Sequence, residues 1–297
     1  MHNYYTIFKV MKKSKKLKMK IIWVLMLVLW ASGCEKKGNM PKDSPATITF
    51  INVQKADAII IQADGKNYLI DTGTKESFNQ LKSVLDMLEI KQLDGVFLTH
   101  GDKDHIGGFS DLSKQIVIKQ LYISEFGEIY DKNVLATAKD CQIVVSKLTY
   151  NQEVTLSENC AFKVLSPSRQ YNNDNNNSLV MLFTINNHTV LFTGDMCEKA
   201  TAEFMENNKG VEAELLKVAH HGDSDCNSQE FIDMVDPRFA VISTEYGEKG
   251  TTDHLEVIKR LGNRQVFMTE DYQYGISFIL TKSQEISWKE VTEKEKH

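Results

Sequence analysis

The sequence predicts a single-domain α/β fold. Short β-branched segments alternate with amphipathic helical segments along about 250 residues of the 297-residue chain, and no long linker interrupts them. Hydrophobic residues make up 42% of the chain and there are only 4 prolines, so the chain can build a real core. This composition excludes a disordered tail and a collagen-like repeat.

The domain is expected to open as an antiparallel meander of three strands followed by a helix. The segment 64–67 (DGKN) has the residues of a hairpin turn between the second and third strands. Apolar residues recur at spacings of three and four over residues 76–89, which predicts an amphipathic helix. The three β-branched segments before this helix are residues 47–53, 58–63 and 68–71.

The same alternation predicts the elements of the remainder of the chain. Further strands are expected at residues 94–99, 120–124, 142–145, 179–185, 189–193, 215–219, 239–243, 265–269 and 275–280. Further helices are expected at residues 130–139, 198–207 and 254–261. The Asn-rich segment 172–177 is expected to be a polar loop, and the charged end, 289–297, a solvated and frayed tail.

The charge distribution argues against a protein that binds nucleic acid over its whole surface. The formal charge is −5, but seven lysines lie in the first 20 residues, which contain no acidic residue. The remainder has 28 basic against 40 acidic residues, a net charge of −12. Such a body lacks the positive field that provides most non-specific affinity for polyanions, so no stable nucleic-acid complex is expected.

The first 33 residues have the composition of a secretory signal peptide. An apolar run of 11 residues (21–31) follows the lysines, which is too short for a helix that spans a bilayer. The segment Ala31-Ser32-Gly33-Cys34 resembles the bacterial lipobox, which implies a lipid anchor at Cys34 on the extracytoplasmic face of the cell membrane. The alternative is an uncleaved single-pass anchor. Residues 35–46 are polar and predict a flexible tether to a domain at 47–297.

The body contains four more cysteines, and no two of them have the C-x-x-C spacing of a zinc or redox motif. An oxidising compartment would permit a disulfide such as Cys141 with Cys160. Cys197 and Cys226 lie near candidate ligands in the sequence. We interpret all four as buried small residues rather than as metal ligands.

The predicted strand 94–99 leads directly into the most informative segment of the chain. Four potential ligands fall within six residues, and two glycines follow them, which permits a tight turn. Imidazoles mixed with carboxylates favour zinc, manganese or iron over calcium or a thiolate site. The four residues are His100, Asp102, Asp104 and His105.

The segment THGDKDHIGG (99–108) resembles the first ligand motif, H-x-H-x-D-H, of the metallo-β-lactamase superfamily, with Asp102 in place of the middle histidine. This replacement is similar to the hydrolase-like domain of the competence protein ComEC. Five further segments agree in order: YLIDTG (68–73), NNNSLVMLF (175–183), VLFTGD (190–195), LLKVAHHG (215–222) and TDHLEVIKRL (252–261). The resemblance covers residues 47 to 280 and implies an αββα four-layer sandwich.

The resemblance also implies a site with two divalent metal ions. His100 and Asp102 would bind one ion, Asp104 and His105 the other, and Asp195 would bridge them. In the pair His220-His221, one imidazole would complete the second site and the other would face the scissile group. The resemblance does not say which. His254 matches a histidine that contacts substrate, although a surface histidine at a helix start is the alternative.

The chain departs from the wider superfamily where a histidine usually completes the first site. The sole histidine between residues 106 and 219 is His188, in a predicted turn, which we interpret as structural. Asn177-Ser178 stand in the corresponding place and are expected to bind a substrate phosphate or water. The first metal is therefore expected to be weakly held, and occupancy by one metal is an alternative.

These residues predict a metal-dependent hydrolase, most plausibly a phosphodiesterase. Two cations that share Asp195 would activate a hydroxide at neutral pH, with Asp104, His220 and His221 closest to the chemistry. Asp102 makes the site harder, which favours manganese or zinc and phosphoester chemistry. The substrate would be an anionic phosphodiester, in DNA or in envelope polymers or lipids. The alternatives are β-lactam or thioester hydrolysis and a non-catalytic binding lipoprotein; the sequence does not define an oligomeric state.

Overall fold

The computed structural model describes residues 45–126, 132–247, 250–282 and 285–293. The chain divides into two units, Met1–Lys42 and Asp43–His297, and all the described residues belong to the second. The predicted signal peptide, Cys34 and most of the predicted tether lie outside the described residues. In the part of the chain that is described, no helix has the length and apolar character needed to cross a membrane.

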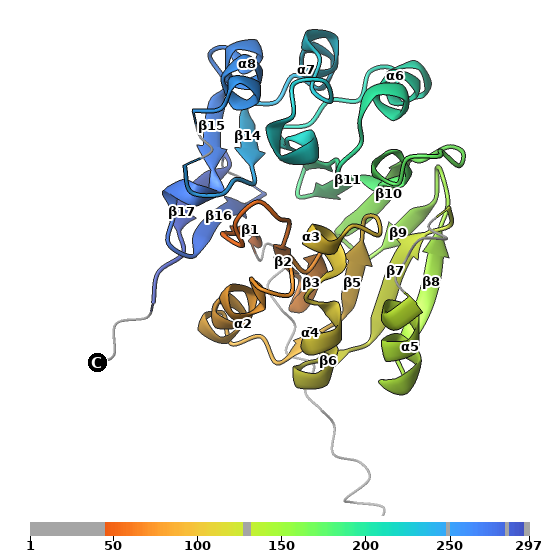
Figure 1. Cartoon of the computed structure of the whole chain (residues 1–297). Helices are drawn as coiled ribbons and strands as arrows, with labels where there is room; N and C mark the ends of the chain where they lie inside the picture. Colours follow the sequence, from red (N-terminus) through yellow and green to blue (C-terminus); the bar gives the residue numbers. More distant parts are fainter. Residues whose placement is uncertain (1–44, 127–131, 248–249, 283–284, 294–297) are drawn as a thin grey trace, which may run out of the picture. The chain divides into compact units, whose positions relative to one another are not determined.

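Two mixed β-sheets organise the domain (Figure 1). In the first sheet, β3, β5, β7 and β8 are parallel, whereas the meander β1–β2–β3 and the pairs of β16 with β1 and β17 are antiparallel. Its spatial order is β17 (Ser287–Glu290), β16 (Gly275–Leu280), β1 (Ala46–Ile51), β2 (Ile59–Ala63), β3 (Lys66–Ile70), β5 (Gly95–Leu98), β7 (Gln120–Ser124) and β8 (Val144–Leu148).

The second sheet has seven strands, parallel from β12 to β15 and antiparallel from β9 to β12. Its spatial order is β15 (Gln265–Met268), β14 (Phe239–Ile242), β13 (Leu215–Lys217), β12 (His188–Phe192), β11 (Val180–Ile185), β10 (Cys160–Ser166) and β9 (Glu153–Thr155). A small sheet pairs β4 (Gln92–Leu93) with β6 (Val117–Ile118).

Helices cover the outer face of each sheet. The α-helices are α2 (Phe78–Met87), α3 (Lys103–Ile106), α4 (Phe109–Gln115), α5 (Lys132–Asp140), α6 (Glu198–Asn207), α7 (Gln229–Val235) and α8 (Thr252–Leu261). Short 3₁₀ turns are η1 (Asn175–Asn177), η2 (Ala219–Gly222) and η3 (Thr269–Asp271).

Three apolar clusters separate four layers. The central cluster lies between the sheets, where Phe97 of the first sheet packs on Phe162 of the second with ring centroids 4.8 Å apart. A second cluster joins α2, α4 and α5 to the first sheet, and a third joins α6, α7 and α8 to the second sheet. The order helix, sheet, sheet, helix is the predicted αββα sandwich, and this prediction is confirmed.

The structure adds elements that the sequence analysis did not predict, namely the strands β4, β6, β9, β10 and β17 and the helices α3, α4 and α7. In β10, buried Phe162 and Val164 flank exposed Lys163, so alternation alone predicts a strand there. The prediction of a frayed tail from residue 289 is wrong at its start. β17 pairs with β16 through residue 290, and the ring centroids of Trp288 and Phe267 lie 5.0 Å apart. Packing therefore anchors this edge strand.

Phe162→Ala is expected to lower the free energy of unfolding by about 3–5 kcal/mol, because it removes a fully buried ring from the interface between the two sheets. Val117→Ala, at a side chain 61% exposed, is the control and should change stability by less than about 0.5 kcal/mol. Urea unfolding followed by circular dichroism measures both. A loss below about 1 kcal/mol for Phe162→Ala would show that this interface is not the main core.

Candidate metal centre

The candidate ligands lie where strands of both sheets end. The segment 99–105 follows β5, Asp195 follows β12, and the pair His220-His221 follows β13. Because β5 runs parallel to β3 and β13 to β12, these ends share one edge of their sheets. The amide of Leu179, which leads into β11, donates to the carbonyl of Thr99 at 2.9 Å. Loops of the two sheets therefore meet at this edge.

The Asp195 carboxylate stands at the centre of the group. It is 2% exposed, and the Nε2 atoms of four imidazoles face its Oδ2 atom. The distances are 3.1 Å from His105, 3.6 Å from His221, 3.8 Å from His100 and 3.9 Å from His220. This is the residue that the sequence analysis expects to bridge two metals.

Asp104, His105, Asp195 and His221 form a compact group in which one ligand atom from each residue lies within 4.8 Å of all the others. The Nε2 atom of His221 lies 3.3 Å from Oδ2 of Asp104. His221 is 2% exposed, whereas the side chain of His220 is 33% exposed. Of the histidine pair, His221 is therefore the one that joins the expected second site.

His100, Asp102 and His220 contribute the remaining donors. The Nε2 atom of His100 lies 3.6 Å from Oδ2 of Asp102, whose side chain is half exposed. His220 lies outside the compact group, and its Nε2 atom points to Asp195. All seven ligands expected from the sequence therefore lie at one edge of the sheets.

Asp71 sets the proton positions of two ligand imidazoles. Its Oδ2 atom accepts from Nδ1 of His105 at 2.8 Å and from the hydroxyl of Thr99 at 2.7 Å. Since that hydroxyl proton is used, the Thr99 oxygen can accept from Nδ1 of His100 at 3.1 Å. Both rings therefore carry their proton on Nδ1 and turn the Nε2 lone pair toward Asp195.

Several buried polar atoms at this centre have no hydrogen-bond partner among the described residues. They include the Nε2 atoms of His100, His105 and His221, together with Oδ1 of Asp195 and of Asp57. Unpaired buried polar atoms are costly, and here lone pairs of nitrogen and oxygen face one another. Imidazole nitrogen and carboxylate oxygen together are donors for zinc or manganese, so this set fits divalent cations.

Asp57 and Lys217 belong to the centre, although the sequence analysis did not identify them. The Nζ atom of Lys217 lies 2.5 Å from Oδ2 of Asp57 and 3.8 Å from Oδ1 of Asp195, and it donates to the carbonyl of Gly194 at 3.3 Å. A lysine inside the buried strand β13 indicates a paired charge. Asp57, in a loop, had no comparable signal.

The charges at the centre shift one another's pKa values. Burial raises the pKa of Asp195, but the imidazoles of His105 and His221 outweigh burial and hold it well below its usual range. Burial raises the pKa of Asp104 as well, and the neighbouring imidazoles of His221 and His105 outweigh burial and bring it to about 2. Conversely, burial lowers the pKa of His105, but Asp195 and Asp71 raise it well above its usual value. The centre thus favours positive charge.

The three residues expected to bind substrate are instead buried supports. Asn177 is 1% exposed, and its side chain bonds to the amide and carbonyl of Tyr171 at 2.8 and 3.0 Å. Ser178 is 0% exposed, and its Oγ atom accepts from the amide of Asp195. His254 is 3% exposed, and its Nε2 atom donates to the carbonyl of His221 at 2.8 Å. The expectation of substrate contact is therefore wrong for these three side chains, because each is enclosed and paired with backbone.

The Asn-rich segment does more than connect two strands. The carboxylate of Asp174 accepts from the amide of Gly101 at 2.9 Å, and Nδ2 of Asn175 lies 3.3 Å from Nε2 of His220. The Asn176 amide oxygen accepts from the amide of Cys197 at 3.1 Å. The segment therefore joins three loops that carry candidate ligands, a role that its composition did not reveal.

The cysteines correct one expectation. Cys197 and Cys226 form a disulfide, whereas Cys141 is exposed and free and Cys160 is buried and free. The suggested Cys141–Cys160 bridge is wrong, because these residues do not pair in the structure. The interpretation of all four cysteines as buried small residues is wrong as well, since Cys141 is exposed and Cys197 and Cys226 are bridged. The interpretation of His188 as structural agrees with its contacts, since its ring bonds to Glu214 at 2.6 Å and to the carbonyl of Thr281 at 2.8 Å.

A search with protein-family models gives the decisive match. The model of the metallo-beta-lactamase superfamily matches residues 52–245, more than half of the chain, and this range includes the seven ligands. The chain belongs to the metallo-beta-lactamase superfamily.

Curated relatives of this superfamily member are competence proteins. It is 28% identical to ComE operon protein 3 of Bacillus subtilis over 253 residues, which is 78% of this chain and 32% of that protein. It is 25% identical to the competence protein ComA of Neisseria gonorrhoeae, over 69% of this chain and 28% of that protein. The chain thus spans about a third or less of the length of these relatives.

Solved structures share the superfamily fold. The metallo-beta-lactamase fold protein YhfI from Bacillus subtilis aligns with a TM-score of 0.53 and 14% identity, over 80% of this chain and 100% of that one. A diphosphatase from the PhnP family aligns with a TM-score of 0.51 and 15% identity, over 80% of this chain and 99% of that one. At these identities the likeness shows the fold alone.

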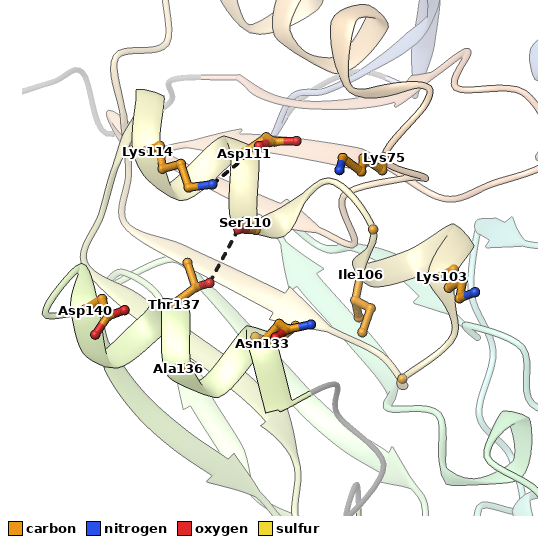
Figure 2. A pocket seen from close by; sticks show the side chains of 13 residues that line it. Lys75, Lys103, Ile106, Ser110, Asp111, Lys114, Asn133, Ala136, Thr137 and Asp140 are labelled. Carbon is orange, nitrogen blue, oxygen red and sulfur yellow. Dashed lines mark hydrogen bonds and ion pairs between the residues drawn. The ribbon is translucent and has the colours of Figure 1, made fainter.

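A recess lies beside the ligand loop of this metallo-beta-lactamase fold, between the start of α4 and α5 (Figure 2). It has a volume of about 630 Å³, and Gly101 and Lys103 of the ligand loop line it. Lys75 and Lys114 also line it, with Asp111 3.7 Å from Lys114. Three lysines, Lys75, Lys103 and Lys114, therefore line a hollow next to the candidate metal centre, together with the two aspartates Asp111 and Asp140.

Asp71→Asn is expected to weaken divalent metal binding by about 10–100-fold, because an amide can donate to Nδ1 of His105 and so favour the tautomer with a proton on Nε2. Titration with Mn²⁺ followed calorimetrically measures the change. Asp233→Asn, at an exposed site on α7, is the control and should bind Mn²⁺ as the wild type does. Equal affinity in both variants would show that Asp71 does not set the tautomer.

Proposed function

We propose that this protein is a metal-dependent phosphodiesterase. One observation carries the proposal: four imidazole nitrogens converge on one oxygen of the buried Asp195 carboxylate. Lone pairs that face one another in a buried site are stabilised by a proton or a metal cation between them, and a set of this size can hold metal cations. Divalent cations bound there would supply a water of lowered pKa and neutralise charge on a phosphoryl oxygen.

The residues of the chain have distinct parts in this proposal. Asp195 and His221 hold the centre from the second sheet, and Asp104 and His105 hold it from the first. Asp102, Asp104 and His220 are the ligands with partly exposed side chains, at 50%, 33% and 33%, so they face an incoming substrate. The ammonium of Lys217 lies 3.8 Å from Oδ1 of Asp195, on the side away from the imidazoles that face Oδ2.

The donor set supports phosphoester chemistry rather than β-lactam or thioester cleavage. Asp102 stands where the wider superfamily has a second histidine, and carboxylate oxygen is a harder ligand than imidazole. Manganese or zinc fits this set. The PhnP-family protein of similar fold is described as a diphosphatase, which is consistent with phosphoester chemistry on this scaffold.

The lysine-lined recess supports an extended anionic substrate. The body outside the first 20 residues carries a net charge of −12, so a local group of lysines beside the site is the feature that a polyanion can use. A single-stranded nucleic acid or an envelope polyphosphodiester fits this arrangement better than long duplex DNA. The competence-protein relatives favour the nucleic acid, and the acidic surface argues against a stable complex with it.

We also propose an extracytoplasmic, lipid-anchored location through Cys34. The lipobox-like segment 31–34 is one support. The Cys197–Cys226 disulfide is another, because disulfides persist mainly in oxidising compartments. A non-catalytic binding lipoprotein is less well supported, since every expected ligand lies at the centre.

Asp104→Ala is expected to reduce Mn²⁺-dependent hydrolysis of bis-p-nitrophenyl phosphate by about 100-fold or more, because it removes a ligand that faces the reaction. The metal-free variant should unfold at a somewhat lower temperature than metal-free wild type, because the lowered pKa of Asp104 means that the neighbouring imidazoles attract its carboxylate, and circular dichroism checks that the variant remains folded. Asp233→Ala is the matched control. For the wild type, chelation with EDTA should abolish hydrolysis, and addition of Mn²⁺ should restore it. β-Lactam hydrolysis without phosphodiester turnover would contradict the proposal.

Lys75→Glu/Lys114→Glu is expected to lower kcat/KM for a single-stranded oligonucleotide about tenfold at low salt, because two positive charges at the recess become negative. The loss should shrink as salt is added. Turnover of bis-p-nitrophenyl phosphate, which does not reach the recess, should stay within about twofold. Lys209→Glu, at an exposed lysine beyond α6, is the control. An equal loss on both substrates would exclude the recess as a substrate subsite.

A further inference from the structure

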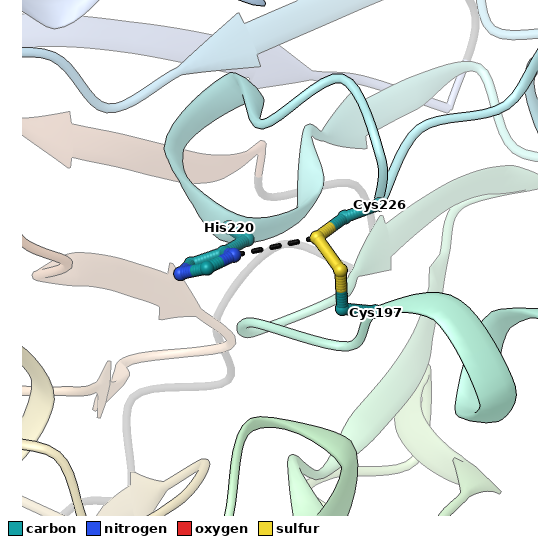
Figure 3. A group of neighbouring side chains, drawn as sticks. All are labelled: Cys197, His220 and Cys226. Carbon is teal, nitrogen blue, oxygen red and sulfur yellow. Dashed lines mark hydrogen bonds between the residues drawn. A yellow bond between two sulfur atoms is a disulfide. The ribbon is translucent and has the colours of Figure 1, made fainter. Parts of the chain in front are cut away.

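The Cys197–Cys226 disulfide connects two loops that carry candidate ligands (Figure 3). Cys197 follows Asp195 by two residues, and Cys226 follows His221 by five. The two cysteines are 29 residues apart in the sequence. The bridge therefore ties the loop after β12 to the loop after β13 within a few residues of the metal centre.

One sulfur of the bridge contacts the most exposed of the ligand imidazoles. The Sγ atom of Cys226 lies 3.3 Å from Nδ1 of His220, as Figure 3 shows. A disulfide sulfur has no proton and can only accept, and Oδ2 of Asp223, 3.4 Å from the same nitrogen, is a carboxylate acceptor as well. The proton of His220 is therefore held on Nδ1, and the Nε2 lone pair faces Asp195.

The backbone of this loop needs external support. His220 and His221 have φ angles of 46° and 51°, in the left-handed region that residues with a Cβ seldom adopt. The Asn227 side chain bonds to both the amide and the carbonyl of Ala219, at 3.0 and 2.9 Å. Nε2 of His254 holds the carbonyl of His221.

Within this loop, a side chain holds the carbonyl of His221, whereas the ring of His220 has contacts at both of its nitrogens, with Asn175 at Nε2. The bond from His254 reaches the carbonyl of His221, and that ring packs in the buried centre. The ring of His220 is a third exposed, and the contacts at its Nδ1 atom are Cys226 and Asp223. Loss of the bridge is therefore expected to release His220 before His221.

We propose that the Cys197–Cys226 disulfide is a redox-sensitive element that positions His220. Its reduction lowers the affinity for the metal ion that His220 binds and leaves the affinity for the other metal ion unchanged. The inference rests on the proposed metal-dependent function. Reduction by a dithiol breaks the S–S bond, and two electrons and two protons convert it to two thiols while the dithiol closes to its own disulfide. The Cys226 thiol then becomes a possible donor to Nδ1, so the tautomer of His220 is no longer fixed.

The experiment compares Mn²⁺ binding by the full chain in its oxidised form, after dithiothreitol, and as Cys197→Ser/Cys226→Ser. Manganese is a hard cation that thiols bind poorly, so new thiols do not obscure the titration. His220→Ala is the reference for loss of the ligand. Cys141→Ser/Cys160→Ser is the control, because it keeps the bridge and removes the two cysteines that are free among the described residues.

Reduction and the double serine variant are each expected to lower one of two Mn²⁺ affinities about 10–100-fold, the same affinity that His220→Ala lowers. The other affinity should stay unchanged, and reoxidation should restore the first in wild type. Cys141→Ser/Cys160→Ser should respond to dithiothreitol as wild type does. Circular dichroism and the thermal midpoint establish that each form remains folded, and reduction of folded wild type provides a test even where the double variant folds poorly.

Two results would overturn the inference in different ways. A lower thermal midpoint on reduction, with both Mn²⁺ affinities unchanged, would make the bridge a structural cross-link only. If the oxidised wild type binds no Mn²⁺, zinc or other divalent cation, the proposed function itself fails, and this inference fails with it. The activity assay adds a further distinction, because loss of positioning lowers kcat for bis-p-nitrophenyl phosphate more than it raises KM.

Discussion

The inward-facing oxygen of Asp195 is the point on which the two sheets of this protein converge. Two of the imidazoles that face it come from the segment after β5, and two come from the loop after β13. The carboxylate is held at that point by groups that leave Oδ2 free. The Ser178 hydroxyl accepts from its amide, and Lys217 lies near its other oxygen. Gly194 permits the turn, since a Cβ there would lie 2.9 Å from Cβ of Ser178.

This arrangement costs folding free energy unless cations are bound. Asp57, Asp71 and Asp195 are each at most 2% exposed, and Lys217 is the buried ammonium among them. Removing carboxylates from water costs several kcal/mol each, and Lys217 together with the imidazole of His105, which lies between Asp71 and Asp195, offsets only part of this cost. Divalent cations that bind the folded state and not the unfolded state would offset this cost, so metal binding and stability are thermodynamically linked. The candidate metal centre thus acts as a structural element of the fold as well.

The sequence was most informative where ligands are close together in the chain. The segment 100–105 predicts its own site, because four donors directly follow a buried strand. Asp195 and the His220-His221 pair were recognisable through the resemblance, since each follows an apolar strand. Asp57 was not, because a single aspartate in a loop has the same pattern whether it faces solvent or, as here, a buried lysine. Lys217 had a signal, a charge within an apolar strand, that could have been used.

Residues that act through the backbone were the hardest to predict. Asn177, Ser178 and His254 match a family pattern, and that pattern does not distinguish a side chain that contacts substrate from one that holds a loop. The disulfide was missed for a related reason. The two cysteines are 29 residues apart, and only the parallel pairing of β12 with β13 brings the loops that carry them together. Such pairings depend on tertiary structure, which periodicity does not encode.

The two sheets support their ligands in different ways, and this difference explains why the disulfide lies at the loops of the second sheet. Asp104 and His105 lie on α3, where the amide of His105 bonds to the carbonyl of Asp102 and the carbonyl of His105 accepts from Thr72 at 2.7 Å. The histidines of the second sheet instead occupy a left-handed turn that regular hydrogen bonding does not maintain. Side chains from α8, from the Asn-rich segment and from the disulfide supply what the backbone lacks. The adaptable part of the centre is therefore the loop after β13. The Cys197–Cys226 disulfide, whose stability depends on redox conditions, ties this loop to the loop after β12.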